Sequence, residues 1–282
     1  MQHDTHSALQ FHFLYLFGFL LLLAPGAVYR WLWSRHRHAF RDAIPLWRVR
    51  AFYCGLLFLW LALASPLAGL DHQLLTLHMV QHLLLSTVAA PLLLLGEPVL
   101  LMTCGRRQGF DALSPSCSSQ EAQARRAAER LTHPVFCWLA AVGTLLAWHV
   151  PRIFEQAMGS PSLHAFEQFS FFATGILFWW PVIRPWPGTS VWPRWTTPLY
   201  LLLATLPCDA LSAFLAFCGR VVYRGYLDGP RQFQISPLQD QECAGALMWV
   251  WVTVVYLVPA VFVTLQLLAP PVSRKGGERE AT

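Results

Sequence analysis

Charged residues are scarce in this chain. Asp, Glu, Lys and Arg make up 12% of its 282 residues, whereas about 25% is usual for a soluble domain. Hydrophobic residues make up 55%, and 13 tryptophans are present. Tryptophan is enriched where helices meet the membrane surface. The composition therefore argues against a soluble domain and indicates a membrane protein.

Paired cysteines are also lacking. None of the seven cysteines belongs to a Cys-x-x-Cys pair, so the metal and redox motifs built on that spacing are not expected. Cys218 and Cys243 flank the outer connection between the last two apolar runs. Because disulfides form in oxidising compartments, we predict that these two cysteines close this connection as a disulfide.

Seven apolar runs are long enough to cross a bilayer as helices of about 20 residues. We therefore expect an all-α membrane protein with a seven-helix transmembrane bundle over residues 11–269. Its longest connections are a cytoplasmic loop at 105–133 and an outer loop at 219–242. The expected spans are Phe11–Trp33, Val49–Ser65, Gln73–Leu95, Pro134–Val150, His164–Ile183, Pro198–Gly219 and Cys243–Ala269.

Basic residues sort to one side of these spans. With the N-terminus outside, 16 of the 20 Lys and Arg residues fall in the connections on one side, which the positive-inside rule makes cytoplasmic. The outer tail is then 1–10 and the cytoplasmic tail 270–282. The pI near 9.0 reflects this topology. We therefore expect the chain to interact with membrane lipid and not with nucleic acid.

Histidines sort to the other side. Three of the eleven are cytoplasmic and eight lie on or near the outer face, namely His3, His6, His12, His72, His78, His82, His149 and His164. The histidines before the first span form a polar tail. Its alternative function is a metal-gathering arm, in which the free amine and His3 chelate Cu(II).

The third span carries a polar stripe. At 100° per residue, Asp71, His78 and His82 lie within about 40° of one another on a helix. His78 lies roughly 8 Å and His82 roughly 14 Å below the outer end of the span. Polar groups in lipid face the bundle interior and pair with something. A single histidine is explained by helix-to-helix hydrogen bonding, but a pair at i and i+4 can hold one ion.

Other spans bring polar groups to the same layer. His149 ends the fourth span, His164 begins the fifth, and Gln241 and Met248 share one face at the start of the seventh. Thioether ligands select Cu(I), and imidazoles bind copper and zinc. We therefore predict a copper site, with Cu(I) as the ion, at His78, His82, His149, His164 and Met248. Its outer rim and supporting residues are Asp71, His72, Asp240 and Gln241.

An acid lies in the middle of the sixth span. Asp209 follows Pro207 and Cys208, and an ionisable group at this depth is a candidate functional residue. Two interpretations stay open from the sequence. Asp209 is either a protonated structural acid at a proline kink or a charge partner for a cation.

Five segments make the chain resemble the CtaG family of cytochrome c oxidase assembly factors, the multi-span kind associated with caa-type oxidases. The resemblance covers about residues 65–268, and the sixth span matches no family motif. The segments are LHMVQHLLL, APLLLLGEP, AWHVP, LHAFEQFSFFATGILFWWPV and SPLQDQECAGALMW. The family's recurring positions correspond here to His78, His82, His149, His164, Asp240, Gln241, Met248 and Trp249.

The resemblance implies a non-enzymatic role in the bacterial plasma (inner) membrane. The expected function is to take copper from a periplasmic donor and deliver it to a subunit of a haem-copper oxidase. Three rivals remain: a b-type haem electron carrier, a scaffold that binds no metal, and a zinc hydrolase. The last is weakened because Met79, Val80 and Gln81 stand between the histidine pair, without the glutamate of a His-Glu-x-x-His motif.

Overall fold

The computed structural model describes residues 22–36, 44–65, 69–106, 129–185, 192–227 and 234–269. Within these ranges every regular element is a helix, which confirms the all-α class. The predicted tails at 1–10 and 270–282 lie outside the described residues, as do His3, His6, His12 and most of the predicted loop at 105–133.

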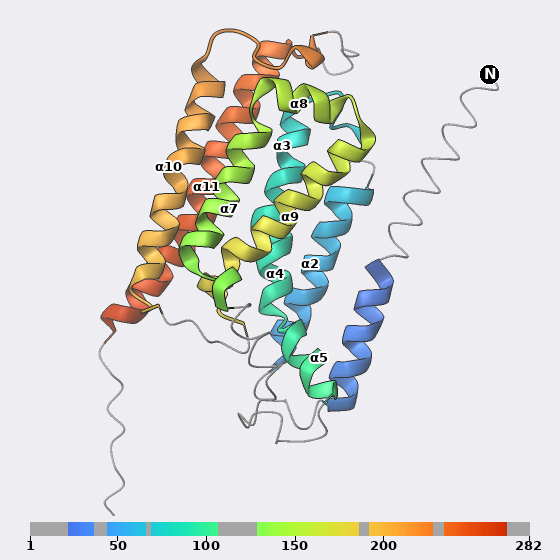
Figure 1. Cartoon of the computed structure of the whole chain (residues 1–282), viewed down its shortest axis with the longest axis vertical. Coiled ribbons are helices and arrows are strands. Elements are labelled where there is room, and N and C mark those ends of the chain that lie inside the picture. The colour runs from blue at the N-terminus through green and yellow to red at the C-terminus, as the bar shows by residue number, and fades with distance from the viewer. Residues whose placement is uncertain are drawn as a thin grey trace, which may run out of the picture.

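The helices form an elongated bundle. Helix α8 and the short η4 lie at one end, and α5 lies at the other (Figure 1). A first helix occupies residues 22–36. The others are α2 (Leu46–Ala64), α3 (Leu75–Leu83), the π-helix η2 (Leu84–Ala89), α4 (Ala90–Leu95), α5 (Pro98–Arg106), α7 (Pro134–Trp148), α8 (Pro151–Met158), α9 (Pro161–Ile183), α10 (Thr196–Phe217), the 3₁₀-helix η4 (Arg224–Tyr226) and α11 (Pro237–Leu268).

Four helices are long and apolar enough to cross a membrane. They are α2, the continuous run Leu75–Leu95, α10 and α11. Helices α7 and α8 pass the same test only as a pair, and the pair is bent by 77°. The described residues therefore support four or five spans; the predicted count of seven and the orientation of the termini stay predictions.

The bend after α7 has a local cause. Pro151 is the first residue of α8, and proline cannot continue a helix because it lacks the N–H. The chain turns through His149 and Val150, and α8 then buries Phe154 and Ala157 against the bundle. The predicted fourth span to Val150 thus ends at Trp148, which leaves His149 in the turn.

A widened helical turn follows the histidine pair. The π-helix η2 begins directly after Leu83, and π-helical turns occur frequently at functional sites. Gly175 of α9 packs against it: a Cβ at Gly175 would lie 2.7 Å from the Ser86 Cα. Trp179 donates to the Ser86 carbonyl at 3.0 Å. The absence of a side chain at Gly175 lets α9 approach the helix that carries both histidines.

The segment APLLLLGEP joins three helices. Gly96 packs on Phe52 of α2, where a Cβ would come within 2.6 Å of the Phe52 Cβ. The Gly96 carbonyl accepts a hydrogen bond from Tyr29 at 2.7 Å, and Glu97 forms an ion pair of 2.6 Å with Arg48. The recurring motif therefore fixes the end of the bundle opposite α8.

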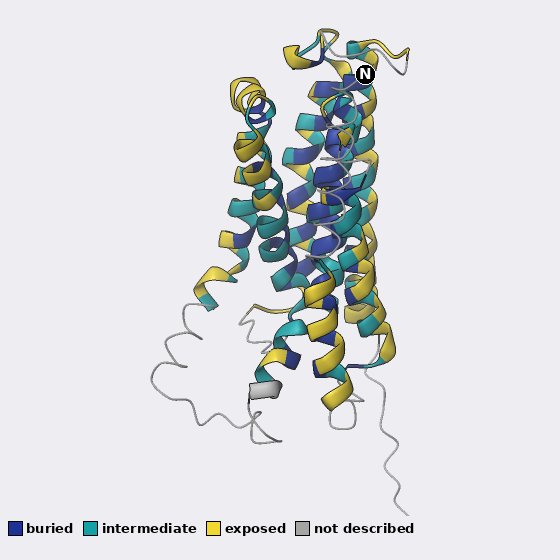
Figure 2. Ribbon diagram, turned by 90° about the vertical axis from the view of Figure 1, so that its right-hand side faces the viewer, coloured by how far each residue is buried: buried dark blue, intermediate teal, exposed yellow. Residues whose placement is uncertain are grey.

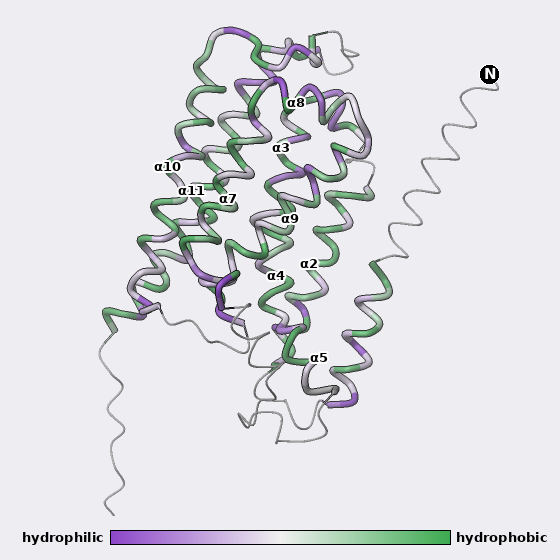
Figure 3. Tube along the Cα trace, viewed as in Figure 1, coloured by the Kyte–Doolittle hydropathy of each residue, from purple (hydrophilic) through white to green (hydrophobic). Residues whose placement is uncertain are grey.

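Burial and hydropathy follow the bundle geometry. Buried residues line the faces where helices meet (Figure 2), and hydrophilic residues gather toward the two ends of a mainly hydrophobic trace (Figure 3). Polar residues are nevertheless buried inside the half nearer α8, including His78, His82, Glu167 and Gln241. Buried polar groups need hydrogen-bond or ion partners, so these residues indicate where a functional site lies.

The outer connection before α11 is shorter than predicted. Helix α11 begins at Pro237 and not at Cys243, because Ser236 and Gln239 form a capping box. Cys243 therefore lies inside the helix on an exposed side, while Cys218 follows the end of α10. Both cysteines are free, so the predicted disulfide is wrong.

Candidate metal site

Three ligand-type side chains meet inside the bundle. His78 and His82 of α3 place their Nε2 atoms 2.7 Å apart. Glu167 of α9 brings Oε1 to 3.4 Å from His78 Nε2 and to 3.2 Å from His82 Nε2. All three residues are buried. We call them the central triad, and the i and i+4 spacing predicted from the sequence indeed directs both imidazoles to one point.

The central triad leaves several polar atoms unused. Nδ1 of His78, Nδ1 of His82 and Oε2 of Glu167 are buried and have no hydrogen-bond partner. A neutral imidazole has one N–H and one lone pair, so neither tautomer satisfies both nitrogens of these rings. Unsatisfied buried polar atoms are rare in folded proteins. Hydrogen bonding between helices therefore leaves part of the central triad unsatisfied, on the far side of each imidazole from the point where the Nε2 atoms meet.

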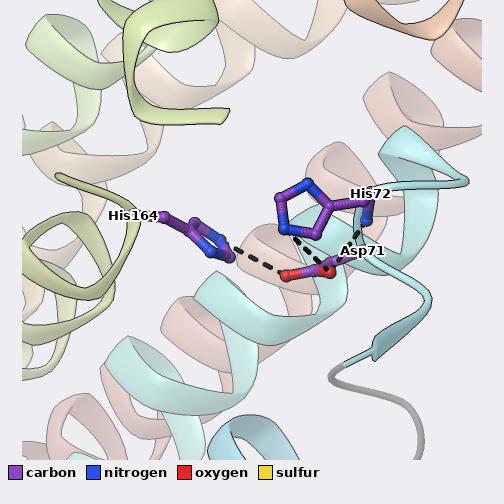
Figure 4. Close-up of side chains that lie close together, drawn as sticks. All are labelled: Asp71, His72 and His164. Carbon is purple, nitrogen blue, oxygen red and sulfur yellow. Dashed lines mark hydrogen bonds and ion pairs between the residues drawn. The ribbon is translucent and has the colours of Figure 1, made fainter. Parts of the chain in front are cut away.

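A second group lies beside the central triad, toward α8. His164 Nε2 of α9 is 3.3 Å from Asp71 Oδ2, and His72 Nε2 is 3.9 Å from Asp71 Oδ1 (Figure 4). We call Asp71, His72 and His164 the outer triad; its ligand atoms lie within 4.8 Å of one another. The rings of His164 and His78 stack with centroids 5.5 Å apart. The two triads are therefore in direct contact.

His149 and Met248 lie on the other side of the central triad. With His82 they line a cavity of about 70 Å³ between α3, α7, α9, α10 and α11. His149 Nδ1 donates to the Leu145 carbonyl at 2.7 Å, and its Nε2 is buried without a partner. The structure thus brings His78, His82, His149, His164 and Met248 into one continuous region.

Asp240 and Gln241 hold the helices that carry the site. Asp240 accepts hydrogen bonds from the Leu75 N–H at 2.6 Å and the Thr76 N–H at 3.1 Å, and so caps α3 from α11. Gln241 donates to the Leu215 carbonyl in the last turn of α10 and to the Arg220 carbonyl after it, and it accepts from the Val222 N–H. Both side chains are occupied by backbone groups, and their predicted place at the outer rim of an ion site stays a prediction.

The cap supplied by Asp240 gives a first test. Replacement Asp240→Asn removes the negative charge that faces two N–H groups at the start of α3, and such caps contribute about 0.5–2 kcal/mol. We expect a lower unfolding midpoint in detergent and a small loss of metal affinity, because α3 carries two members of the central triad. Glu242→Gln, two residues further along α11 at a partly exposed position, is the matched control and should change neither quantity.

Two tyrosines from the outer connection brace the same region. Tyr226 donates to the Asp71 carbonyl at 2.8 Å and Tyr223 to the His149 carbonyl at 3.1 Å. Burial raises the pKa of both hydroxyls well above the ordinary value, and the Asp71 carboxylate adds to this for Tyr226. Both therefore remain donors across the physiological pH range.

Two predicted positions lie apart from the site. Asp209 is partly buried on α10, its Oδ1 has no hydrogen-bond partner, and it does not line the cavity. Trp249 is 38% exposed and meets Phe217 edge-on. The choice between a structural acid and a cation partner at Asp209 therefore stays open.

The sequence interpretation missed Glu167 as a site residue. A signal was present, because Glu167 lies three residues after His164 and so near the same helix face, and because an acid inside a span is expected to be functional. Met79 was missed as well, although it is buried and lines the cavity.

Comparisons with known proteins identify the family of the chain. The chain is 24% identical over 216 residues, 73% of its length, to an uncharacterized protein of Mycobacterium leprae (strain TN), and it spans about a third (32%) of that relative. No solved structure matches. The family described as cytochrome c oxidase caa3 assembly factor matches residues 27–269. This match covers nearly all described helices and both triads, and the chain therefore belongs to the cytochrome c oxidase caa3 assembly factor family.

Proposed function

We propose that this protein takes up copper at the outer face of the bacterial plasma (inner) membrane and passes it, without catalysis, to a subunit of a haem-copper oxidase. The observation that carries this proposal is the central triad. Its two imidazoles and one carboxylate converge on one point inside an apolar bundle, where all three residues are buried and their ligand atoms lie within 4.8 Å of one another. Copper is the cargo of this site.

The central triad suits Cu(I) in size and in charge. Ligand atoms around an ion bound at 2.0–2.1 Å in a tetrahedral site lie about 3.3 Å apart. The three distances are 2.7, 3.2 and 3.4 Å, so binding requires only a small separation of the imidazoles. One Glu167 carboxylate and one Cu(I) sum to zero charge, and burial of a net charge in lipid is costly.

The outer triad is the receiving position. His72 also lines a hollow of about 290 Å³ that Glu155, Met158 and Tyr226 border at the α8 end of the bundle. A periplasmic donor would release copper there, to Asp71, His72 and His164. Because His164 stacks on His78, the ion moves from the outer triad to the central triad over a distance of a few ångströms.

The haem rival finds little support. His78 and His82 present their Nε2 atoms to the same point and cannot bind opposite faces of one haem. The cavity between His82 and His149 is about 70 Å³, far below the roughly 300 Å³ at which small-molecule pockets begin. The remaining alternative is an assembly scaffold that binds no metal, and the experiment below distinguishes it from copper transfer.

The proposal is tested in the host cell under copper limitation. Without this protein, we expect the membrane haem-copper oxidase to retain haem and to lose most of its copper, as measured by its metal content and visible spectrum. The wild-type chain should restore copper. The chain with His78→Ala and His82→Ala should not.

The matched control is His133→Ala. This histidine contacts Trp192 and precedes α7 at the end of that helix opposite His149. This variant should restore oxidase copper fully. Full copper in the oxidase of cells that lack the protein contradicts the proposal. Full restoration by the His78→Ala, His82→Ala variant at equal expression supports the scaffold instead.

A further inference from the structure

A second cluster of soft ligands lies beyond the central triad. Five of the residues that line the cavity of about 70 Å³ have ligand-type side chains, namely Met79, Met248, Cys208, His82 and His149. These residues come from α3, α10, α11 and the turn after α7. Met79, Met248 and Cys208 are each at most 4% exposed.

The His149 ring is set up as a ligand. Its Nδ1 must be the donor in the 2.7 Å bond to the Leu145 carbonyl, since a carbonyl only accepts. The neutral ring therefore has its lone pair on Nε2, which is buried and has no hydrogen-bond partner, and His149 is one of the residues that line the cavity. A hydrogen bond from the second nitrogen to a backbone carbonyl is one of the usual ways in which proteins orient a metal-binding histidine.

We propose that this cavity is a second binding site, selective for a soft monovalent ion such as Cu(I), with His149, Met248 and Cys208 as ligands. Thiolate and thioether sulfur select Cu(I) over harder ions. Binding replaces the S–H bond of Cys208 with a Cu–S bond and releases the proton to the bulk solvent. The resulting thiolate and Cu(I) carry no net charge, as burial in lipid requires. His82 borders both this cavity and the central triad, so it connects the two sites.

The inference rests on the proposed function only for the identity of the ion as copper. It adds the direction in which the ion moves through the bundle. The outer triad offers one carboxylate and imidazoles, the central triad the same set more deeply buried, and the cavity two kinds of sulfur. Sulfur content thus increases from the α8 end toward the middle of the bundle. An ion that reaches the cavity is held as Cu(I).

The test uses the purified full-length protein in detergent, titrated anaerobically with Cu(I) against a chromogenic chelator and then examined by copper X-ray absorption. Wild type should hold two equivalents against the chelator, one at the central triad and one in the cavity, and show sulfur neighbours. The outer triad, which only receives the ion, should not hold copper under these conditions. Met248→Leu with Cys208→Ala should bind one equivalent without sulfur neighbours, or lose at least tenfold in affinity for the second. Glu167→Gln should retain the sulfur-bound equivalent.

Met102→Leu with Cys137→Ala is the matched control, because it removes the same two residue types away from the cavity. It should behave as wild type. Only nitrogen and oxygen neighbours in the wild type, or an unchanged second equivalent in the cavity variant, overturns the inference. If the cavity variant does not fold, Met248→Leu alone should lose one sulfur neighbour. If the purified protein binds copper through sulfur but cells without the protein still make an oxidase with full copper, the cavity site stands and the proposed function is wrong.

Discussion

Replacement Glu167→Gln should abolish high-affinity ion binding at the central triad. Glutamine keeps the volume and one carbonyl oxygen but removes the negative charge that lies within 3.4 Å of both His78 and His82. Loss of one partner from a buried charge pair costs about 2–5 kcal/mol. We therefore expect the Kd for Cu(I) at this site to rise by roughly 100-fold. The measurement is competition with a chelator of known affinity.

Zn(II) gives a second readout of the same change. Two imidazoles and a carboxylate also bind zinc, whereas the sulfur-lined cavity favours Cu(I). Zinc affinity should therefore fall in Glu167→Gln by at least as much as copper affinity. Glu242→Gln, on the partly exposed side of α11, should leave both affinities unchanged. Equal affinities for Glu167→Gln and wild type would show that the carboxylate is not part of the ion site.

The polar face of α3 follows from sequence periodicity alone. Residues four apart on a helix lie on one face whatever packs against them, so the convergence of His78 and His82 was predictable. Their partner was not. Which face of α9 meets α3 depends on the close approach at Gly175 and on the bond from Trp179 to the Ser86 carbonyl, and this packing selects Glu167 as the third ligand.

The ends of elements were predictable only in part. Pro151 marks the end of α7, but the 77° bend that keeps His149 at the cavity depends on how α8 buries Phe154. Ser236 caps α11 ahead of its apolar run, so Cys243, which was predicted to begin the last span, lies inside α11. Hydropathy locates a span, but it does not locate the ends of the helix, because these depend on local hydrogen bonds.

The effect of Glu167→Leu on stability should have opposite signs in the wild type and in a variant that lacks the two histidines of the central triad. In wild type, Glu167→Leu should destabilise the protein, because His78 and His82 lose the acceptor that both contact. With His78→Leu and His82→Leu already in place, the carboxylate is left buried without a partner, and an uncompensated buried charge costs about 3–5 kcal/mol. Adding Glu167→Leu to that double variant should therefore raise stability.

The four proteins of this cycle are compared without metal by titrating helicity with denaturing detergent. Leucine is used because its volume is close to that of the side chains it replaces, so the cycle reports charge and hydrogen bonding more than cavity formation. We expect Glu167→Leu to lower the unfolding midpoint of wild type and to raise that of the double variant. An equal effect in both backgrounds would mean that the glutamate and the histidines act independently, which is incompatible with a common ion site.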